Sequence, residues 1–343
     1  MAELHPTLPR AEKLRFALKP DSGCCRLCGS GAQQRTVAPE SHVGAGQVIR
    51  RCGVCAGVYL APDFTDDSLD RFYRHHYRRL FPFEAMWGSE RRFFAWRGDR
   101  VVAALRFARV QPHLARGAHL LEMGSGFGAF LGAAAGVDGI RLSATEPDIT
   151  NRTRLIGGAD VAFVPDIDAV AAGDLDVVVA FHVLEHLAEP GVALKQVLTA
   201  LKPGGRAFFE VPDLMRGAIS PSLFHPAHLS YFTVATLSAL AGNAGFRIIS
   251  AGPHPDGGVL ADNIWIELQK PSAGETATAA PPATVQDIAA IDARLAAVDW
   301  QPTRRQQLQR AAKRLVLATA GPGPIGELQR YRQRRALRRV GWT

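Results

Sequence analysis

Four cysteines near the amino terminus have the spacing of a metal site. The stretches "CRLC" and "CGVC" place Cys25, Cys28, Cys52 and Cys55 in two C-x-x-C pairs separated by 23 residues. Gly29 follows the first pair and Gly53 lies within the second, and glycine tolerates the tight turn of a zinc knuckle. Two such pairs donate four thiolates to one tetrahedral zinc ion, and a site with four protein ligands is closed to water and therefore structural. Cys24 is an alternative to Cys25, but the C-x-x-C spacing favours Cys25.

A second group combines histidine and glutamate. In "FHVLEH", His182, Glu185 and His186 follow the order H-x-x-E-H, which is typical of inverted zinc peptidases. That chemistry needs both imidazoles on one face of a helix. The preceding "LDVVVAF" is a β-branched apolar run, so we expect His182 to end a strand and the two histidines to point in different directions. The sequence therefore favours a strand-to-helix corner, braced by Glu185, over a metal site.

A glycine-rich stretch could bind a nucleotide. "HLLEMGSGFGAF" places Gly124, Gly126 and Gly128 between a predicted strand and a predicted helix, where backbone can approach a ligand closely and the helix start offers unpaired N–H groups. Glu146 lies 22 residues beyond Gly124, and its carboxylate can accept hydrogen bonds from both ribose hydroxyls. The pattern also fits a dinucleotide, and hence an NAD-dependent enzyme, because Ala129 can fill the last small position of G-x-G-x-x-G/A.

The elements around these residues alternate between strand and helix. Strands are predicted at residues 119–123, 141–146, 160–164, 175–181, 206–212, 246–252 and 263–270, and helices from about 129 and at 190–201 and 233–245. A "KPGG" turn precedes the strand at 206–212, and the last two strands are close enough to pair as an antiparallel edge hairpin. Such alternation gives an α/β doubly wound sheet, with ligands at the carboxyl ends of its strands.

Five stretches stand in order within about residues 116–270: "LLEMGSGFG", "ATEPD", "DVVVAFHVLEHLAEP", "LKPGGRAFFEVP" and "HPAHLSYFT" with "LSALAGNAGF". Together they resemble the class I S-adenosylmethionine-dependent methyltransferases of the small-molecule type. The resemblance implies a Rossmann-like methyltransferase sheet and S-adenosylmethionine as cofactor. Glu146 would hold the ribose, Asp166 the adenine amino group, and the glycine loop the methionine and adenosine portions. The cofactor-binding residues implied are Glu122, Gly124, Ser125, Gly126, Gly128, Glu146, Pro147, Asp166, Ile167, Phe181 and His182, the last two near the sulfonium.

Residues 24–80 are similar to the zinc-binding amino-terminal module of sugar-nucleotide C-methyltransferases. The similarity rests on "CRLCG", "CGVCAGVYLAP" and "LDRFYRHHY". Those enzymes carry a long second carboxyl-terminal domain, for which the 73 residues after Lys270 are too few. Their catalytic Y-x-E-H stretch would align with "HPAH", which keeps His228 but has His225 and Ala227 in place of Tyr and Glu. The departure puts C-methylation in question and leaves zinc and cofactor binding as expectations.

Methyl transfer asks the protein mainly to align donor and acceptor, with a base only where the acceptor must lose a proton. Histidine suits that role because its ordinary pKa near 6.5 leaves it largely neutral at pH 7. The predicted catalytic residues are His186 and His228, and the predicted substrate contacts are Tyr73, Tyr77 and His225. We expect transfer to oxygen or carbon of a small hydroxylated metabolite, a sugar or nucleotide sugar.

The charge distribution leaves two alternatives. Residues 301–343 hold eleven Lys and Arg against one acid, Glu327, whereas the whole chain has a net charge of +8. A basic tail attracts nucleic acid, an acidic partner or an acidic surface, and it is also typical of a solvated helix face. A nucleic-acid methyltransferase that uses the zinc module and tail is one alternative; a non-catalytic adaptor that keeps the cofactor fold is the other.

The predicted organisation has five consecutive parts. These are a zinc-ribbon-like module at 1–60, a helical connector at 61–115, the cofactor-binding domain at 116–270, a linker at 271–284 and a basic helical tail at 285–343, with helices at 285–299, 303–319 and 325–339. No apolar run approaches the roughly 18 residues of a membrane span, and the start "MAELHPTLPRAEKLRF" has no signal-peptide core, so a cytoplasmic protein is expected.

Overall fold

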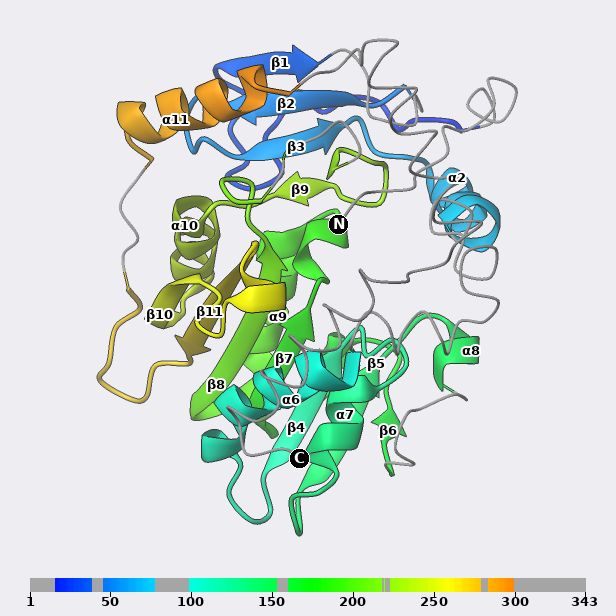
Figure 1. Ribbon diagram of the computed structural model, residues 1–343, viewed down its shortest axis with the longest axis vertical. Coiled ribbons are helices and arrows are strands. Elements are labelled where there is room, and N and C mark those ends of the chain that lie inside the picture. Colours follow the sequence, from blue (N-terminus) through cyan, green and yellow to red (C-terminus); the bar gives the residue numbers. More distant parts are fainter. Residues whose placement is uncertain are drawn as a thin grey trace, which may run out of the picture. The chain divides into compact units, whose positions relative to one another are not determined.

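The computed structural model describes residues 16–38, 46–77, 99–152, 160–217, 219, 223–278 and 283–298 (Figure 1). The chain divides into two compact units. The first contains the described parts of residues 1–97, 218–231 and 283–331, and the second those of residues 98–217 and 232–282. The helices predicted at 303–319 and 325–339 lie outside the described residues.

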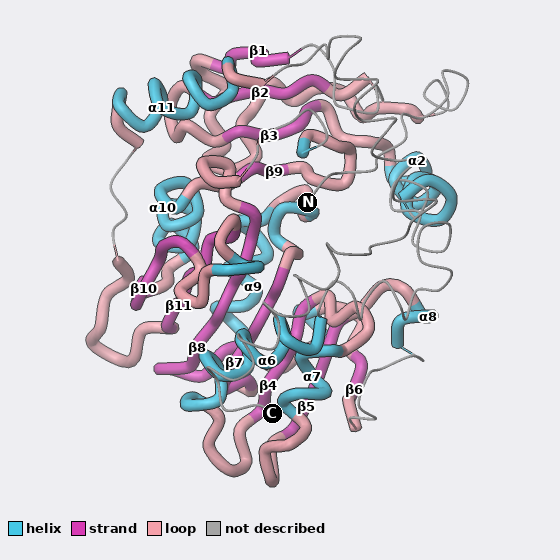
Figure 2. The backbone as a smooth tube through the Cα atoms, in the orientation of Figure 1, coloured by secondary structure: helices cyan, strands magenta, loops and turns pink. Residues whose placement is uncertain are grey.

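The second unit is built on a seven-stranded sheet with the order β10-β11-β8-β7-β4-β5-β6 (Figure 2). Its strands are β4 (His119–Met123), β5 (Arg141–Thr145), β6 (Ala162–Phe163), β7 (Leu175–Phe181), β8 (Leu201–Pro212), β10 (Arg247–Pro253) and β11 (Asn263–Gln269). The pairs from β6 to β8 are parallel, whereas β11 pairs antiparallel with β8 and with β10. The predicted doubly wound sheet and its antiparallel edge hairpin are confirmed. The strand order reverses between β4 and β7, which is where such sheets bind ligands.

The helices of this unit flank the sheet. They are α6 (Asp99–Val110), α7 (Ala129–Ala134), α8 (Ile149–Arg152), α9 (Pro190–Ala200) and α10 (Val234–Ala244), with short 3₁₀ turns η2 (Gln111–His113), η3 (Ile167–Ala169), η4 (Leu184–His186) and η6 (Gly258–Leu260). Phe107 of α6 and Phe130 of α7 pack into one buried cluster with Phe181 of β7. Thr233 and Thr236 form a capping box that begins α10, and Gly245, with φ of 105°, ends it.

Strand β8 begins earlier than its apolar residues predict. The "KPGG" stretch, expected as a turn before residue 206, is part of the strand from Leu201. Lys270 explains the difference, because its backbone N–H donates to Gly205 and its carbonyl accepts from Gly204, which extends the pairing beyond β11. Gly204 has φ of 80°, a conformation that favours glycine.

The first unit holds a four-stranded antiparallel sheet. Its order is β1 (Gln34–Ala38), β2 (Val48–Cys52), β3 (Val58–Ala61) and β9 (Ser230–Tyr231). Its helices are α2 (Asp66–Arg71), the π-helix η1 (Phe72–Tyr77) and α11 (Val285–Ala296). This unit is therefore formed by three separate stretches of the chain. The predicted organisation into consecutive parts assigns these stretches to different domains. No helix among the described residues is long and apolar enough to cross a membrane.

Helix α11 lies along β1 and β2 (Figure 1) and is fixed there by one carboxylate. Asp292 accepts two hydrogen bonds from Arg51, at 3.0 and 2.9 Å, and one from Arg35 at 3.0 Å. The Arg51 side chain is only 9% exposed, whereas that of Arg35 is 64% exposed. Since a hydrogen bond between charged groups is stronger away from water, Arg51 contributes most of this anchor.

Replacing Arg51 with alanine is therefore expected to loosen α11 locally. A loss of about 1 to 2 kcal/mol corresponds to roughly 5- to 30-fold faster amide hydrogen exchange in α11. Arg35→Ala is the matched control, and its exchange should rise by less than about fivefold. Equal effects of the two variants would show that burial of the pair does not matter.

Candidate functional site

The glycine loop joins β4 to α7 at the carboxyl edge of the large sheet. Gly124, Gly126 and Gly128 all have positive φ, between 53 and 69°. A Cβ on Gly124 would lie 2.8 Å from Cγ2 of Val183, the residue two positions beyond the end of β7. The loop is thus pressed against the β7 corner, and only glycine fits there.

Glu146 ties the glycine loop to the end of β5. It is 6% exposed, and it accepts hydrogen bonds from the backbone N–H of Gly126 (2.7 Å) and of Asp148 (2.9 Å) and from Nδ2 of Asn151 (3.2 Å). A carboxylate has about four acceptor positions, so these three bonds leave it able to accept another. The predicted ribose ligand therefore sits directly beside the loop that is predicted to hold the rest of the cofactor.

The other predicted cofactor residues lie along the same edge. Ser125 donates its N–H to the carbonyl of Thr145 at 3.1 Å, and Pro147 is exposed just after β5. Asp166 begins η3 after β6, where its carboxylate accepts the N–H of the buried Ile167 at 2.6 Å. The ends of β4, β5 and β6 thus present these groups on one side of the sheet, as parallel strands require.

Glu122 occupies an apolar position near the end of β4. It is 5% exposed, and its Oε2 has no hydrogen-bond partner among the described residues. Burial raises the pKa of Glu122 well above its ordinary value, although the charge of Arg106 acts in the opposite direction. A carboxyl group in this setting favours its neutral form.

The β7 corner separates the two histidines of "FHVLEH". Strand β7 ends at Phe181, His182 follows with φ of 59°, and His186 ends the 3₁₀ turn η4. The strand was predicted to end at His182 and ends one residue earlier, because His182 has left the extended conformation. The two histidines do not share a helix as an inverted zinc peptidase requires. The Phe181 ring packs in the core, with its centroid 5.0 Å from that of the Phe130 ring. We therefore expect Phe181 to contact a cofactor through its backbone.

Glu210 of β8 contacts His182 at this corner. No motif in the sequence indicated this residue. It is fully buried and accepts hydrogen bonds from Arg106 of α6 through Nε (2.8 Å) and Nη2 (2.7 Å). Asn263 of β11 and the Nε2 atom of His182 also contact its Oε1. The signal available in the sequence was a single glutamate within the apolar run "AFFEVP".

The predicted substrate and base residues of the first unit lie near β9. His225 is 3% exposed, its Nδ1 accepts the N–H of Ala227 at 3.3 Å, and its ring centroid lies 4.1 Å from that of His228. Tyr73 is 37% exposed on the π-helix η1, a type of helix that is frequent at functional sites. The side chain of Tyr77 lies outside the described residues.

The four predicted metal ligands are brought together in the first unit. Their Sγ atoms all lie within 4.8 Å of one another, with Cys25 3.6 Å from Cys55 and Cys28 3.8 Å from Cys52. Four sulfurs about 2.3 Å from a tetrahedral zinc would lie about 3.8 Å apart, whereas a disulfide needs about 2.05 Å. Cys24 is exposed and is not part of the group. The donor set and its spacing therefore fit zinc.

The closeness of these thiols also couples their ionisation. Hydrogen bonding to Cys55 lowers the pKa of Cys25, and the same contact raises the pKa of Cys55. Burial raises the pKa of Cys28.

A Ser-His-Asp arrangement lies at the opposite edge of the large sheet. His119 Nε2 is 2.7 Å from Ser143 Oγ, and His119 Nδ1 is 2.9 Å from Asp174 Oδ2. Ser143 is only 4% exposed and sits within β5, so its hydroxyl is closed to a substrate. The arrangement ties strands together and is not a nucleophilic site.

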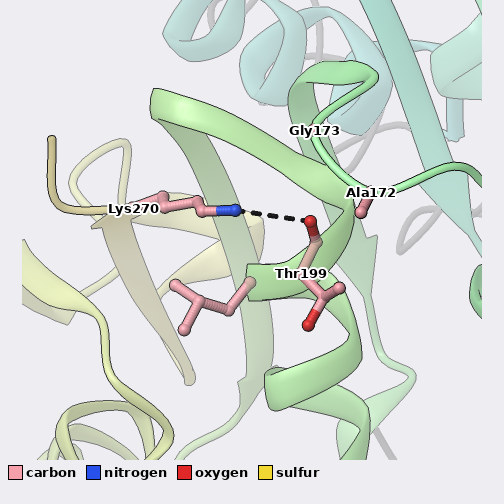
Figure 3. A pocket seen from close by; sticks show the side chains of 5 residues that line it. Ala172, Gly173, Thr199 and Lys270 are labelled. Atoms are coloured by element: carbon pink, nitrogen blue, oxygen red, sulfur yellow. Dashed lines mark hydrogen bonds between the residues drawn. The ribbon is translucent and has the colours of Figure 1, made fainter. Parts of the chain in front are cut away.

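A shallow depression near the amino end of β7 is lined by Ala172, Gly173, Leu198, Thr199 and Lys270 (Figure 3). Lys270 Nζ donates to the carbonyl oxygens of Thr199 and Leu201, at 3.3 and 2.7 Å. The Lys270 ammonium group is therefore hydrogen-bonded to backbone carbonyls. The depression also lies away from the carboxyl ends of the strands. It is not a candidate for the cofactor site.

Comparisons with known proteins agree with this geometry. Residues 93–251 match a family described as a methyltransferase domain. A search of curated proteins finds no significant match. Similar solved structures include an S-adenosylmethionine-dependent methyltransferase from Mesorhizobium loti, with 14% identity over 49% of this chain and 99% of that one and a TM-score of 0.42.

Two other solved structures are similar at the same level. Phosphoethanolamine N-methyltransferase 2 from Haemonchus contortus, in complex with S-adenosyl-L-methionine, has 17% identity over 59% of this chain and 60% of that one and a TM-score of 0.44. A SAM-dependent methyltransferase from Aquifex aeolicus has 13% identity, 48% and 88% coverage and a TM-score of 0.40. Residues 93–251 match a methyltransferase domain and hold the parallel strands of the large sheet, which has a Rossmann-like methyltransferase fold.

Proposed function

We propose that this protein transfers a methyl group from S-adenosylmethionine to oxygen or carbon of a small hydroxylated metabolite, a sugar or a nucleotide sugar. The observation that carries the proposal is the hydrogen bond from the Gly126 N–H to Glu146, which joins the glycine loop after β4 to the carboxylate proposed to hold the ribose after β5. Both lie next to the point between β4 and β7 where the strand order reverses. The sugar class rests on the resemblance of the amino-terminal module alone.

The role of the protein in this reaction is mainly alignment. The bound cofactor supplies a methyl group on a sulfonium, which is already activated for in-line displacement. Glu146 would accept the ribose hydroxyls, Asp166 the adenine amino group, and the glycine-loop backbone would face the methionine portion. Where the acceptor is a hydroxyl, His186 or His228 would take its proton.

The amino-terminal module would bind one zinc ion through Cys25, Cys28, Cys52 and Cys55. The ion would hold the two knuckles and their sheet together and would activate no water, since all four positions are taken by thiolates. The basic tail at residues 301–343 is proposed to dock an acidic partner or surface.

Calorimetric titration of the purified full chain tests the cofactor claim. We expect S-adenosylmethionine and S-adenosylhomocysteine to bind in a 1:1 ratio and NAD not to bind. Binding of neither sulfur compound would overturn the proposal and leave the adaptor alternative, and binding of NAD would point to a dehydrogenase.

A panel of acceptors tests the substrate class. Methyl transfer from radiolabelled S-adenosylmethionine should appear with nucleotide sugars or free sugars and not with RNA or DNA. Label in nucleic acid, together with a steep loss of retention on nucleic acid as salt rises, would favour the nucleic-acid alternative.

A further inference from the structure

Glu210 is the centre of a buried charged group at the carboxyl ends of β7 and β8. Both oxygens of its carboxylate are occupied, Oε2 by Arg106 Nε and Oε1 by Arg106 Nη2, with Asn263 Nδ2 as a further donor to Oε1. The Arg106 guanidinium also lies 4.4 Å from the centroid of the Phe181 ring, which holds its plane in place. Glu210 is therefore fixed from two directions, by α6 and by β11.

The His182 ring lies between two carboxylates. Its Nδ1 is 3.1 Å from Glu185 Oε1, and its Nε2 is 3.2 Å from Glu210 Oε1. Ionised carboxylates only accept hydrogen bonds, so both ring nitrogens must carry a proton for both contacts to be favourable. In a neutral ring, one nitrogen lone pair would face a buried carboxylate oxygen, since Glu185 is 1% exposed and Glu210 is fully buried.

The charged groups around the ring support this charge state, and Asn263 Nδ2, which lies 3.3 Å from His182 Nε2, donates to Glu210 Oε1 instead. Two carboxylates, Glu185 and Glu210, are balanced by Arg106 and a protonated His182. His254 faces Glu210 Oε2 at 3.4 Å, and because its Nδ1 accepts the N–H of Asp256, its Nε2 carries the proton when the ring is neutral. A ring nitrogen of His186 also lies within 4.8 Å of a Glu185 oxygen. No further cation is needed for balance.

We propose that Glu210 is a positioning residue of the methyltransferase site, which keeps the His182 ring doubly protonated and fixes it at the end of β7. The proposal rests on the proposed function. Its first consequence is that His182 cannot act as the base in methyl transfer. Its second is that the left-handed backbone of His182, which is uncommon outside glycine, is held by side-chain contacts and keeps Val183 against Gly124 of the cofactor loop.

The direction of the His182 pKa agrees with the geometry. The His182 side chain is 39% exposed, so burial lowers its pKa only in part, and the hydrogen bonds to Glu185 and Glu210 raise the pKa of His182 to about 9. A histidine with a raised pKa contributes stability that is fully present below its ordinary value near 6.5 and is lost as the pH rises through about 9. The corner should therefore stay intact at neutral pH and loosen in alkali.

Nuclear magnetic resonance of the full chain with ¹⁵N-labelled histidine tests the protonation directly. In the wild-type protein, both nitrogens of His182 should carry protons at pH 8, and the ring should titrate near pH 9. Glu210→Gln should lower that midpoint by at least about one pH unit, because it removes one carboxylate. His182→Asn assigns the signal, since asparagine tolerates positive φ.

Glu267→Gln is the matched control. Glu267 also lies on a strand of this sheet and pairs with an arginine, Arg206, but at the opposite end of β8. It should leave the His182 midpoint unchanged. A wild-type His182 with a single proton at pH 8, or the same midpoint in Glu210→Gln, would overturn the proposal. The wild-type measurement decides the matter even where Glu210→Gln does not fold.

A second experiment measures the affinity for S-adenosylmethionine as a function of pH. Wild-type affinity should be constant up to about pH 8 and fall through about pH 9, and the fall should begin at lower pH in Glu210→Gln but not in Glu267→Gln. A wild-type pH profile that is flat through pH 10 would contradict the positioning role. Absence of cofactor binding at every pH would instead overturn the proposed function, while the ring protonation would still be read separately.

Discussion

Replacing Cys52 with serine should release the metal and unfold the amino-terminal module. Cys52 is fully buried, its Sγ lies 3.8 Å from that of Cys28, and it accepts hydrogen bonds from Gln34 and from the backbone of Val54. Structural zinc contributes about 10–16 kcal/mol of apparent binding free energy, which is as large as the whole stability of a typical domain, about 5–15 kcal/mol. Loss of one of the four ligands is therefore expected to unfold this small sheet.

Metal analysis and hydrogen exchange would measure this effect. The wild-type protein should carry one zinc ion per chain and Cys52→Ser none, with loss of amide protection in β2 and β3. Cys24→Ser is the control, because Cys24 is exposed and outside the thiol group, and it should keep the zinc. A full zinc content in Cys52→Ser would show that the ligand set is different.

Replacing Glu146 with alanine should strongly weaken binding of S-adenosylmethionine. Each hydrogen bond to a charged group contributes about 1.5–3 kcal/mol, so losing the ribose contact alone lowers affinity about 10- to 100-fold. Removal of the carboxylate also frees the N–H of Gly126 and so loosens the loop that should face the methionine portion. We therefore expect the upper end of that range or beyond.

Calorimetry on variants with an unchanged melting temperature would check this value. Glu146→Gln keeps one acceptor oxygen and should lose less affinity than Glu146→Ala. Glu275→Ala is the control, since Glu275 is an exposed carboxylate that pairs with Arg247 away from the loop. Unchanged affinity in Glu146→Ala would remove the ribose assignment.

Local sequence patterns determined most of the large sheet. The apolar run "LDVVVAF" predicts a strand at residues 175–181, and β7 occupies those residues. The start of α7 at Ala129 follows from the glycines before it, and the start of α10 from the threonine at its cap. These features depend on neighbours within a few residues, which is why they can be read from the sequence.

The cysteine spacing also determined which thiols meet. Two C-x-x-C pairs predict a single group of four, and the structure brings together those four and leaves Cys24 out. By contrast, the sequence did not predict which segments join the first sheet. Strand β9 pairs with it and helix α11 packs on it, and both come from far beyond the module. A two-residue strand such as Ser230–Tyr231 has too few residues for a periodic signal.

The charge state of the corner in "FHVLEH" was decided only by the tertiary structure. The sequence identifies His182 and Glu185, three residues apart, but Arg106 and Glu210 are 104 residues apart and Asn263 lies 53 residues beyond Glu210. Periodicity and motif spacing report which face a residue occupies, and they carry no information on which distant side chain will share that face. Sheet order brings these groups together, and burial then requires that each charge has a partner.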